Sequence, residues 1–585
     1  MCGRLAGWPL GAPLPCARPG PFLPPYFQFT LTTHSWASLR GIANDFLNTP
    51  SSAAGADVLS QQRVFFGASI FATKLRQHFD QLPAASLPGL QSTLQGNLQR
   101  LAGAPPYRAA LMQLCVALID LLLQQALHAP DGRATIEQLV QAFPPATHPA
   151  LLTQLLRLLA EQAQSLPALA VGDRRAALRS SLQGCGPALL GLLHSLFTQG
   201  SSSGGAAGLA VCTGALEALG AWCSYPALPA AAVAASPAIG MAVEAALASP
   251  QLLLPAAAAL EELLKAHYRA HASDPAARAL GARLTEGLVR LAPVWGRYAT
   301  GQEDTEEEAI ALANLFSTAV YTFLPQRLKE CPGQAAWEAA GGAWEAEVVS
   351  WTGLLALPGG QPLRSVLEPT FWVWRKLAEE LGALQSAGGD GSGRAGSEAP
   401  HRLAAVRRAL SGPLLAQVPA WLSHLTFPPA AEWSGEMNRE EREAFKHEYR
   451  YDCSDALLLI ASVAGGEAVV GALAGQLQAA LAGWNASLSA AAAAGGSGGS
   501  AVAAGGSGSS SGSAGGGAAA VGMAGSRWRL PCMPCGQWHA WCQRGRAQCC
   551  RSCLCCCWGA ACPCGPPLGS CWPQCFALWG ATVSG

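Results

Sequence analysis

The cysteines near the C-terminus have the spacing in this sequence that most suggests a chemical site. Thirteen of the 21 cysteines follow residue 526, and they include two C-x-x-C pairs, Cys532 with Cys535 and Cys550 with Cys553. Four thiolates complete the tetrahedral shell that zinc prefers, and zinc ribbons use such pairs. The fourteen residues between the pairs fall just short of the usual separation. A zinc module is therefore one interpretation of this tail.

The composition of the same tail supports a second interpretation, which we favour. Residues 527–585 contain six tryptophans but no Asp, Glu or Lys. Such a mixture is what GC-rich DNA yields when it is read out of frame or through an intron. A disulfide scaffold fits less well, because no secretory signal precedes it. We therefore expect an unstructured tail, and we expect no cofactor.

No other stretch has the spacing of a catalytic centre. A Walker loop, a G-x-S-x-G elbow and an H-E-x-x-H motif are all absent from the sequence. The acidic run from Gln302 to Phe316 contains Thr305 and Glu308 in the T-x-x-E order of a capping box. It predicts a well-capped helix, with contact to a basic partner as the alternative. The sequence thus predicts a binding protein and not an enzyme.

Leucine-rich segments with helical periodicity fill the middle of the chain. Between Pro149 and Ala163, leucines at 152, 155, 156 and 159 form one stripe. Pro and Gly interrupt such segments and separate them into pairs, about one pair per 40 residues, which is the period of HEAT-type repeats. Each pair exposes an apolar face that only the next pair can cover. The prediction is an all-α, HEAT-like solenoid with a concave inner surface.

The domain limits follow from composition. Residues 1–34 are irregular and rich in proline, residues 35–488 form the predicted solenoid, residues 489–526 are a Gly/Ser/Ala-rich linker, and residues 527–585 are the tail. The apolar stretches of the body are interrupted, for example by Pro226, Pro229 and Pro237, so we expect no membrane-spanning segment.

Charge is unevenly distributed along the chain. Its formal net charge is zero, but every acidic residue lies at or before Glu467, so the body up to that residue carries −5. Nucleic acid needs clustered cations for its phosphates, and this balance disfavours it as a partner. A basic protein partner is compatible with the charge.

One helical pattern near the N-terminus ends at a proline. In "FFGASIFATKLRQHFDQLP", from Phe65 to Pro83, apolar residues recur on one face up to Phe79. We expect the helix to stop at Pro83 and Phe79 to be buried between repeat units.

The same stretch resembles a segment near the N-terminus of importin-β superfamily receptors, most closely in the transportin-SR branch. Lys74, Phe79, Leu82 and Pro83 match the basic residue, Phe and Leu-Pro of that segment. Four later stretches resemble the same family in the same order: Leu169 to Leu182, Ala215 to Pro229, Glu368 to Leu381 and Glu443 to Gly465. In the last two, Phe371 with Trp372 or Trp374 takes the aromatic places, and Arg450 and Asp455 match the Arg and the Asp.

The resemblance implies a nuclear transport receptor of the karyopherin-β type, present in cytoplasm and nucleus. Its partners would be protein cargo, including Arg/Ser-rich nuclear proteins, the GTPase Ran, which displaces cargo, and nucleoporins. The Pro-rich start replaces the opening helices that contact Ran in the family, and no stretch matches the family's arginine-rich cargo helix. We therefore assign no partner-binding residue from the sequence. A generic HEAT/armadillo scaffold without a transport role is the alternative.

Overall fold

The computed structural model describes residues 36–48, 58–128, 131–165, 172–226, 228–269, 274–298, 303–361, 363–387, 398–425 and 449–495. Within these ranges every regular element is helical and there is no strand, which confirms the all-α prediction. The chain divides into two compact units, Met1–Leu473 and Ala474–Gly585. The Pro-rich start and the cysteine-rich tail lie outside the described residues, and the predicted domain limits remain predictions.

In its described residues, the first unit consists mainly of α-helices and short 3-10 helices. Its N-terminal half contains α2 (Trp36–Leu47), α3 (Val58–Gln77), α4 (Leu87–Leu101), α5 (Arg108–His128), α6 (Gly132–Ala142), α7 (Pro149–Ser165), α8 (Gly172–Gly184), α9 (Gly186–Ser203), α10 (Gly205–Ser224), α11 (Ala230–Ala235), α12 (Ala238–Ala248) and α13 (Pro250–Arg269). It continues with α14 (Pro275–Leu291), α15 (Trp295–Tyr298), α16 (Glu306–Lys329), α17 (Trp337–Gly359), α18 (Arg364–Leu367), α19 (Phe371–Ala387), α20 (Glu398–Leu415), α21 (Val418–Leu425) and α23 (Arg450–Ala464). The last helix, α24 (Gly466–Gly495), begins in this unit and continues into the second.

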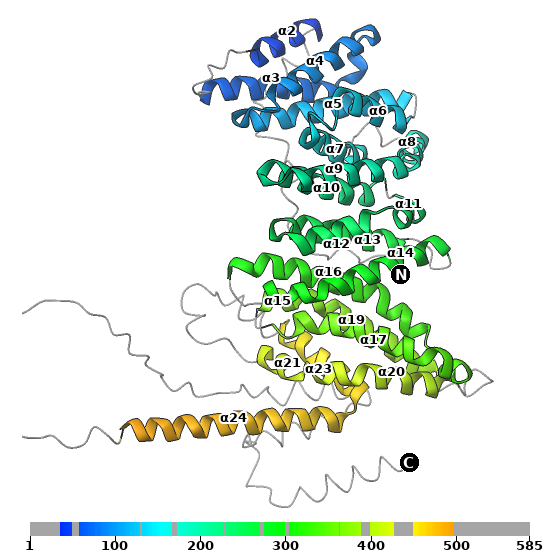
Figure 1. Ribbon diagram of the computed structural model, residues 1–585, viewed down its shortest axis with the longest axis vertical. Helices are drawn as coiled ribbons and strands as arrows, with labels where there is room; N and C mark the ends of the chain where they lie inside the picture. The colour runs from blue at the N-terminus through cyan, green and yellow to red at the C-terminus, as the bar shows by residue number, and fades with distance from the viewer. Residues whose placement is uncertain are drawn as a thin grey trace, which may run out of the picture. The chain divides into compact units, whose positions relative to one another are not determined.

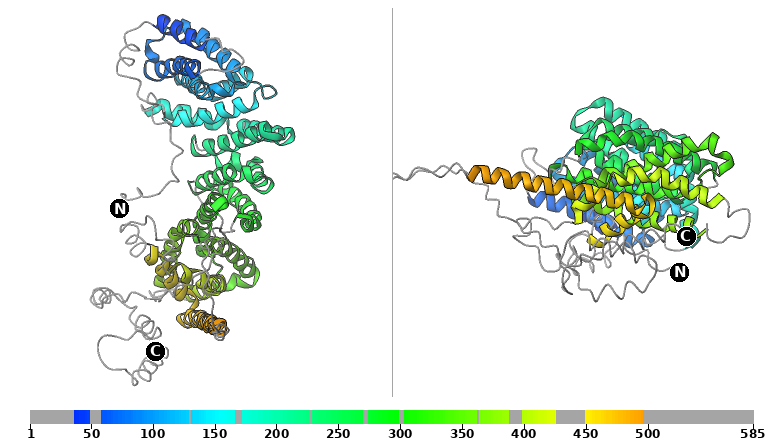
Figure 2. Two further views of the ribbon diagram at one scale, coloured as in Figure 1. Left: turned by 90° about the vertical axis from the view of Figure 1, so that its left-hand side faces the viewer. Right: turned by 90° about the horizontal axis from the view of Figure 1, so that it is seen from below.

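These helices form a ladder in chain order. α3, α5, α7, α10, α13, α16, α19 and α23 each contact the next, and α2, α4, α9, α12, α17 and α20 pack on them. Figures 1 and 2 show the helices stacked one on the next. Each rung therefore buries its apolar stripe mainly against its neighbours, as expected of helical repeats.

The contact between α7 and α10 shows how closely the rungs pack. The four leucines of the predicted stripe on α7 are fully buried. The indole Nε1 of Trp222 donates a hydrogen bond of 2.8 Å to the carbonyl oxygen of Leu156. Gly214 lies against Thr153 so closely that a Cβ atom would be 2.4 Å from the threonine hydroxyl. A residue with a side chain at position 214 would push the two helices apart.

Two described segments are long and apolar enough to cross a bilayer, although the sequence prediction excluded a spanning segment. They are Pro105–Leu127, which includes most of α5, and Gly205–Ser224, which is α10. Of their most apolar windows, 72% and 50% respectively are buried inside the protein. Burial against neighbouring helices is the usual state of apolar core helices in a repeat array.

The prediction for Phe79 was wrong. α3 ends at Gln77, because His78 leaves the helical region with φ −134° and ψ 31°, and Phe79 begins a short 3-10 turn. Leu82 is extended, as a residue before proline prefers to be, so the helix cannot run up to Pro83. Phe79 is only half-buried. The fully buried aromatic residue of α3 is Phe71, whose ring meets Trp36 edge-on at 6.0 Å between centroids.

The capping box predicted at Thr305 is also not formed. Thr305 is the N-cap of α16, as the pattern indicates, but its side chain does not cap the helix. Its hydroxyl instead donates to the carbonyl oxygen of Tyr298 at 2.9 Å. Glu306, in the first helical turn, accepts a hydrogen bond of 2.5 Å from Ser365, so part of the acidic run serves an internal contact.

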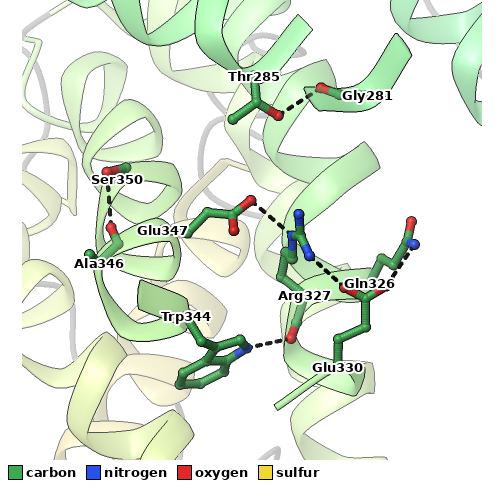
Figure 3. Close-up of polar contacts among 9 residues, drawn as sticks. All are labelled: Gly281, Thr285, Gln326, Arg327, Glu330, Trp344, Ala346, Glu347 and Ser350. Atoms are coloured by element: carbon green, nitrogen blue, oxygen red, sulfur yellow. Dashed lines mark hydrogen bonds and ion pairs between the residues drawn. The ribbon is translucent and has the colours of Figure 1, made fainter. Parts of the chain in front are cut away.

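Arg327 joins α16 to α17 through polar contacts (Figure 3). Its Nε lies 2.8 Å from Glu347, and another guanidinium nitrogen lies 2.7 Å from Glu330. The indole of Trp344 donates to the backbone carbonyl of Arg327 at 2.8 Å. Glu347 and Trp344 of α17 thus both contact Arg327 of α16, one through the side chain and the other through the backbone. The two contacts together fix how α17 is rotated about its own axis relative to α16.

Phe71 and Phe79 provide a matched pair for testing this packing. Phe71→Ala should lower the free energy of unfolding by about 3–5 kcal/mol, as truncation of a fully buried phenylalanine does. Phe79→Ala should cost roughly half of that, because its side chain is only partly removed from water. Urea denaturation followed by circular dichroism measures both. A larger loss for Phe79→Ala would mean that the end of α3 is placed wrongly.

A buried carboxyl group in α5 makes the first unit sensitive to pH. Asp120 has no exposed surface, and neither of its carboxylate oxygens has a hydrogen-bond partner. Burial raises the pKa of Asp120 to about 7, although the charge of Arg76 opposes the shift. An unpartnered carboxylate is costly in an apolar interior, so the neutral form is favoured there.

The raised pKa sets the direction of the stability change. Above pH 7 the native protein must carry a buried charge, and below pH 7 it binds a proton that the unfolded chain does not bind until about pH 4. Stability should therefore rise by about 2 kcal/mol between pH 7.5 and pH 5.5 through this group. Asp120→Asn should remove that increment. Urea unfolding midpoints of both proteins at the two pH values test this prediction. If the stability of Asp120→Asn changes with pH as much as that of the unmodified protein, other groups cause the pH dependence.

A candidate protein-binding groove between α19 and α23

A groove opens between one face of α19 and one face of α23. In the chain, α20 and α21 lie between these two helices. Its volume is about 520 Å³. The residues on α19 recur three or four positions apart, as do those on α23, so each set lies on a single helical face. The lining residues are Phe371, Trp374, Arg375, Ala378, Glu379, Leu381, Gly382 and Gln385 on α19, and Asp452, Asp455, Ala456, Leu458, Leu459 and Ser462 on α23.

An aromatic cluster holds the N-terminal end of this groove. Trp421 of α21 is fully buried and meets Trp374 edge-on at 5.3 Å between ring centroids. Phe371 contacts Trp421 at 5.9 Å and Tyr449 at 5.4 Å. The rings come from three separate segments of the chain, so their packing fixes α19, α21 and the start of α23 relative to one another.

A hydrogen-bonded histidine secures the same corner. His424 Nε2 lies 2.6 Å from the carbonyl oxygen of Gln361, and its Nδ1 lies 2.7 Å from the hydroxyl of Tyr449. A carbonyl oxygen can only accept, so Nε2 carries the proton and Nδ1 accepts from the tyrosine. Burial lowers the pKa of His424, which keeps this neutral form. The guanidinium of Arg364 covers the Tyr449 ring at 4.5 Å.

The opposite face of α19 is tied to α16 by charge. Glu380 has a side chain that is 10% exposed and contacts Lys329 of α16 at 3.0 Å and Lys376 at 3.1 Å. Burial alone would raise the pKa of Glu380, but the hydrogen bonds from the two lysines outweigh it and lower the pKa. α19 is thus held from behind, and its groove-facing residues keep a fixed orientation.

The walls of the groove carry three carboxylates and one guanidinium. Arg375 on α19 forms an ion pair with Asp452 on α23, while Glu379 and Asp455 stand nearby on their own helices. Burial raises the pKa of Asp455, the charge of Asp452 raises it further, and Arg375 opposes both. Lys376, which lies outside the lining, pairs with Glu379 at 3.2 Å. The lining therefore carries three carboxylates and one guanidinium above an apolar floor, and Asp455 is the carboxylate among them that neither Arg375 nor Lys376 pairs with. Such a surface suits a basic segment of another protein.

The sequence resemblance located part of this site. Phe371, Trp374 and Asp455 line the groove as matched residues of two resembling stretches. Trp372 lies elsewhere, against Tyr321 at 4.4 Å, and Arg450 is outside the lining.

Sequence reasoning missed Arg375, Glu379 and Asp452. Arg375 follows the matched Phe371 by four residues and Asp452 precedes the matched Asp455 by three, which was a visible signal. Glu379 follows Arg375 by four residues. The sequence did not indicate that the two helices lie side by side.

Two pairs of neighbouring arginines are exposed on helix faces. Arg174 and Arg175 lie on α8, and Arg407 and Arg408 lie on α20. Arg408 approaches Glu345 at 3.4 Å, which is a surface contact of small energetic value.

No group of His, Cys, Asp and Glu residues that could hold a metal ion occurs among the described residues. The six cysteines described there are buried and form no disulfide with one another: Cys115, Cys185, Cys212, Cys223, Cys331 and Cys453. Burial raises the pKa of the Cys115 thiol, as expected of a core residue. The weak zinc alternative, with Cys532, Cys535, Cys550 and Cys553 as ligands, lies outside the described part of the chain.

Comparison with known proteins gives a likeness of fold. No protein-family model matches the sequence, and no curated protein matches it. Among solved structures, the chain matches one described as "Importin13 cytosolic state" with a TM-score of 0.54 and 14% identity. The chain resembles importin-13 in fold. The match covers 72% of this chain but 44% of the importin-13 chain, so it spans less than half of that protein.

Two further matches are much looser. A circular tandem repeat protein with a novel repeat topology has a TM-score of 0.23 at 14% identity, over 75% of this chain and 97% of its own. The crystal structure of Kap121p has a TM-score of 0.18 at 13% identity, over 75% of this chain and 50% of its own. The importin-13 match supports the helical-repeat fold, and at 14% identity it shows the fold alone.

Proposed function

We propose that this protein is a nuclear transport receptor of the karyopherin-β type, which binds protein cargo through the groove between α19 and α23. The observation that carries the proposal is the acidic, apolar-floored groove, formed by two stretches that each resemble importin-β superfamily sequences. The likeness to importin-13 in fold supports it. The proposed role is binding and not catalysis.

The proposed cargo feature is a basic, arginine-rich segment. Glu379, Asp452 and Asp455 offer carboxylates within one groove, and a guanidinium can donate two parallel hydrogen bonds to a carboxylate. The body carries a charge of −5, which would favour encounter with basic cargo at a distance. Arg/Ser-rich nuclear proteins, the cargo class of the transportin-SR branch, fit this chemistry.

Partners that control transport are part of the same proposal. The resemblance implies Ran and nucleoporins as partners, with movement between cytoplasm and nucleus. The Pro-rich start does not resemble the family's opening helices, where Ran contacts begin. We therefore propose that this chain binds cargo but releases it incompletely when Ran-GTP is added. A generic HEAT/armadillo scaffold remains the second candidate, because the fold alone also serves such proteins.

The groove can be tested with an unphosphorylated Arg-Ser repeat peptide. The full chain should bind it at low salt, and affinity should fall steeply as salt screens the charges. Replacing all three groove carboxylates, by Glu379→Gln, Asp452→Asn and Asp455→Asn, should weaken binding about tenfold or more, since each lost charged contact is worth about 1 kcal/mol. Fluorescence anisotropy measures the affinity.

A matched control variant distinguishes the effect of the groove carboxylates on binding from the effect of the protein's net charge. Asp173→Asn, Glu286→Gln and Glu338→Gln remove three exposed carboxylates from α8, α14 and α17 and change the net charge equally. This control should bind like the unmodified protein. Arg375→Ala should bind more tightly, because it removes the cation that competes for Asp452. Equal losses in both triple variants would show that the groove is not the binding site.

Nuclear entry separates a receptor from a scaffold. Fluorescently labelled full-length protein should enter the nuclei of permeabilised cells faster than an inert protein of similar mass, without added receptors. The reason is that a karyopherin-type receptor binds nucleoporins and so passes the pore unaided. Exclusion equal to that of the inert protein would favour the scaffold.

Adding Ran-GTP to the complex of the full chain with the Arg-Ser peptide should leave part of the peptide bound. Complete displacement of the peptide would show an intact Ran site.

A further inference from the structure

Helix α24 exposes a continuous apolar stripe. Beyond Leu473, each of its large apolar side chains is more than a third exposed to solvent: Leu477 37%, Leu481 54%, Trp484 49% and Leu488 55%. The helix is a single uninterrupted rod (Figures 1 and 2). Soluble proteins seldom leave a row of large apolar side chains in water without a partner.

The spacing of the stripe is that of a coiled coil. The intervals from Leu477 to Leu481, Trp484 and Leu488 are four, three and four residues. Positions d, a, d and a of a heptad follow this order, and such side chains form the seam along which one helix packs on another. The stripe therefore fits another helix better than it fits a flat or irregular surface.

The composition of α24 indicates that it needs a partner. Gly475 and Gly483 lie inside the helix with open space around them, so no close approach explains them. Interior glycines weaken a helix, and a helix without packing contacts is marginal in water. Residues 474–495 lie in the second unit, and their described side chains are exposed. A helix bound along the stripe would supply the missing stabilisation.

Charge narrows the choice of partner. After Glu467, α24 contains no charged residue. A membrane-surface helix carries Lys or Arg on its polar face, so this one does not suit an anionic bilayer. The positions that flank the seam, among them Gln478, Asn485 and Ser487, are also uncharged. Two copies of α24 can therefore approach without repulsion.

The stripe is self-complementary when it is paired with an antiparallel copy. If two copies of α24 cross at their midpoint between residues 482 and 483, Leu481 faces Trp484 of the other copy and Leu477 faces Leu488. Each layer then joins an a position to a d position, which is the layer composition of antiparallel coiled coils. The tryptophan meets a leucine and not a second tryptophan, and opposed helix dipoles favour the same orientation.

We propose that two copies of this protein associate through an antiparallel pairing of α24, with Leu477, Leu481, Trp484 and Leu488 at the interface. This is a two-fold symmetric contact in which the same patch of each copy is used. The seam is short, so the dimer is weak and forms as concentration rises. Its apolar, uncharged interface makes it insensitive to salt, unlike the binding of a basic peptide in the groove.

Sedimentation velocity on the full chain tests the proposal. The protein of 60.2 kDa should shift reversibly toward about twice that mass between low and high micromolar concentration, at both low and high salt. Leu481→Glu should keep it monomeric by placing a charge against the Trp484 ring. Ala479→Glu adds the same charge on the opposite face of α24 and should leave the dimer intact.

A rescue experiment tests the antiparallel register. Leu481→Glu mixed with Trp484→Lys should restore a mixed dimer, because the new glutamate and lysine face each other only in the antiparallel pairing. A monomer at every concentration would overturn the proposal. So would equal behaviour of Leu481→Glu and Ala479→Glu, which would indicate another occupant such as the chain's own C-terminal residues. Dimers without rescue would overturn the register.

Discussion

Burial of each helix's apolar stripe against the next helix is the constraint on which the structure depends. A single amphipathic pair cannot cover its own apolar face, so stability comes from nearest-neighbour contacts along the ladder. The contact of α7 with α10 shows the consequence, since Trp222 and Gly214 of α10 both contact α7 directly. Cores of this kind tolerate charge poorly, and the unpartnered carboxyl of Asp120 is neutralised by its surroundings and not by an ion pair.

The proposed binding groove depends on the same packing at the C-terminal end of the ladder. α19 has one face committed to the core and to Lys329 of α16, so its other face is available and rigidly held. The aromatic cluster around Trp421 and the His424–Tyr449 hydrogen bond then hold α23 opposite. In the proposed function, these two helix faces are already fixed before a basic segment binds, so binding costs little free energy for ordering the groove.

The sequence predicted the fold class because helical periodicity is a local property. The leucine stripe of α7 was visible in fifteen residues and is buried as expected. Local rules failed where tertiary contacts compete with them. α3 ends six residues before Pro83, so Phe79 turns partly to solvent. Thr305 stands at the predicted N-cap but bonds to Tyr298 instead of to its own helix.

The site was less predictable than the fold. Asp455, Phe371 and Trp374 were singled out through family resemblance, but nothing local indicates that α19 and α23 share a groove. Arg375 and Asp452 pair across that groove from positions 77 residues apart, and only the fold brings them together. Hydrogen exchange of the full chain, with and without the Arg-Ser peptide, tests the groove most directly. The account predicts added protection confined to α19, α23 and the turns beside them. Protection elsewhere on the ladder, with α19 and α23 unchanged, would contradict it.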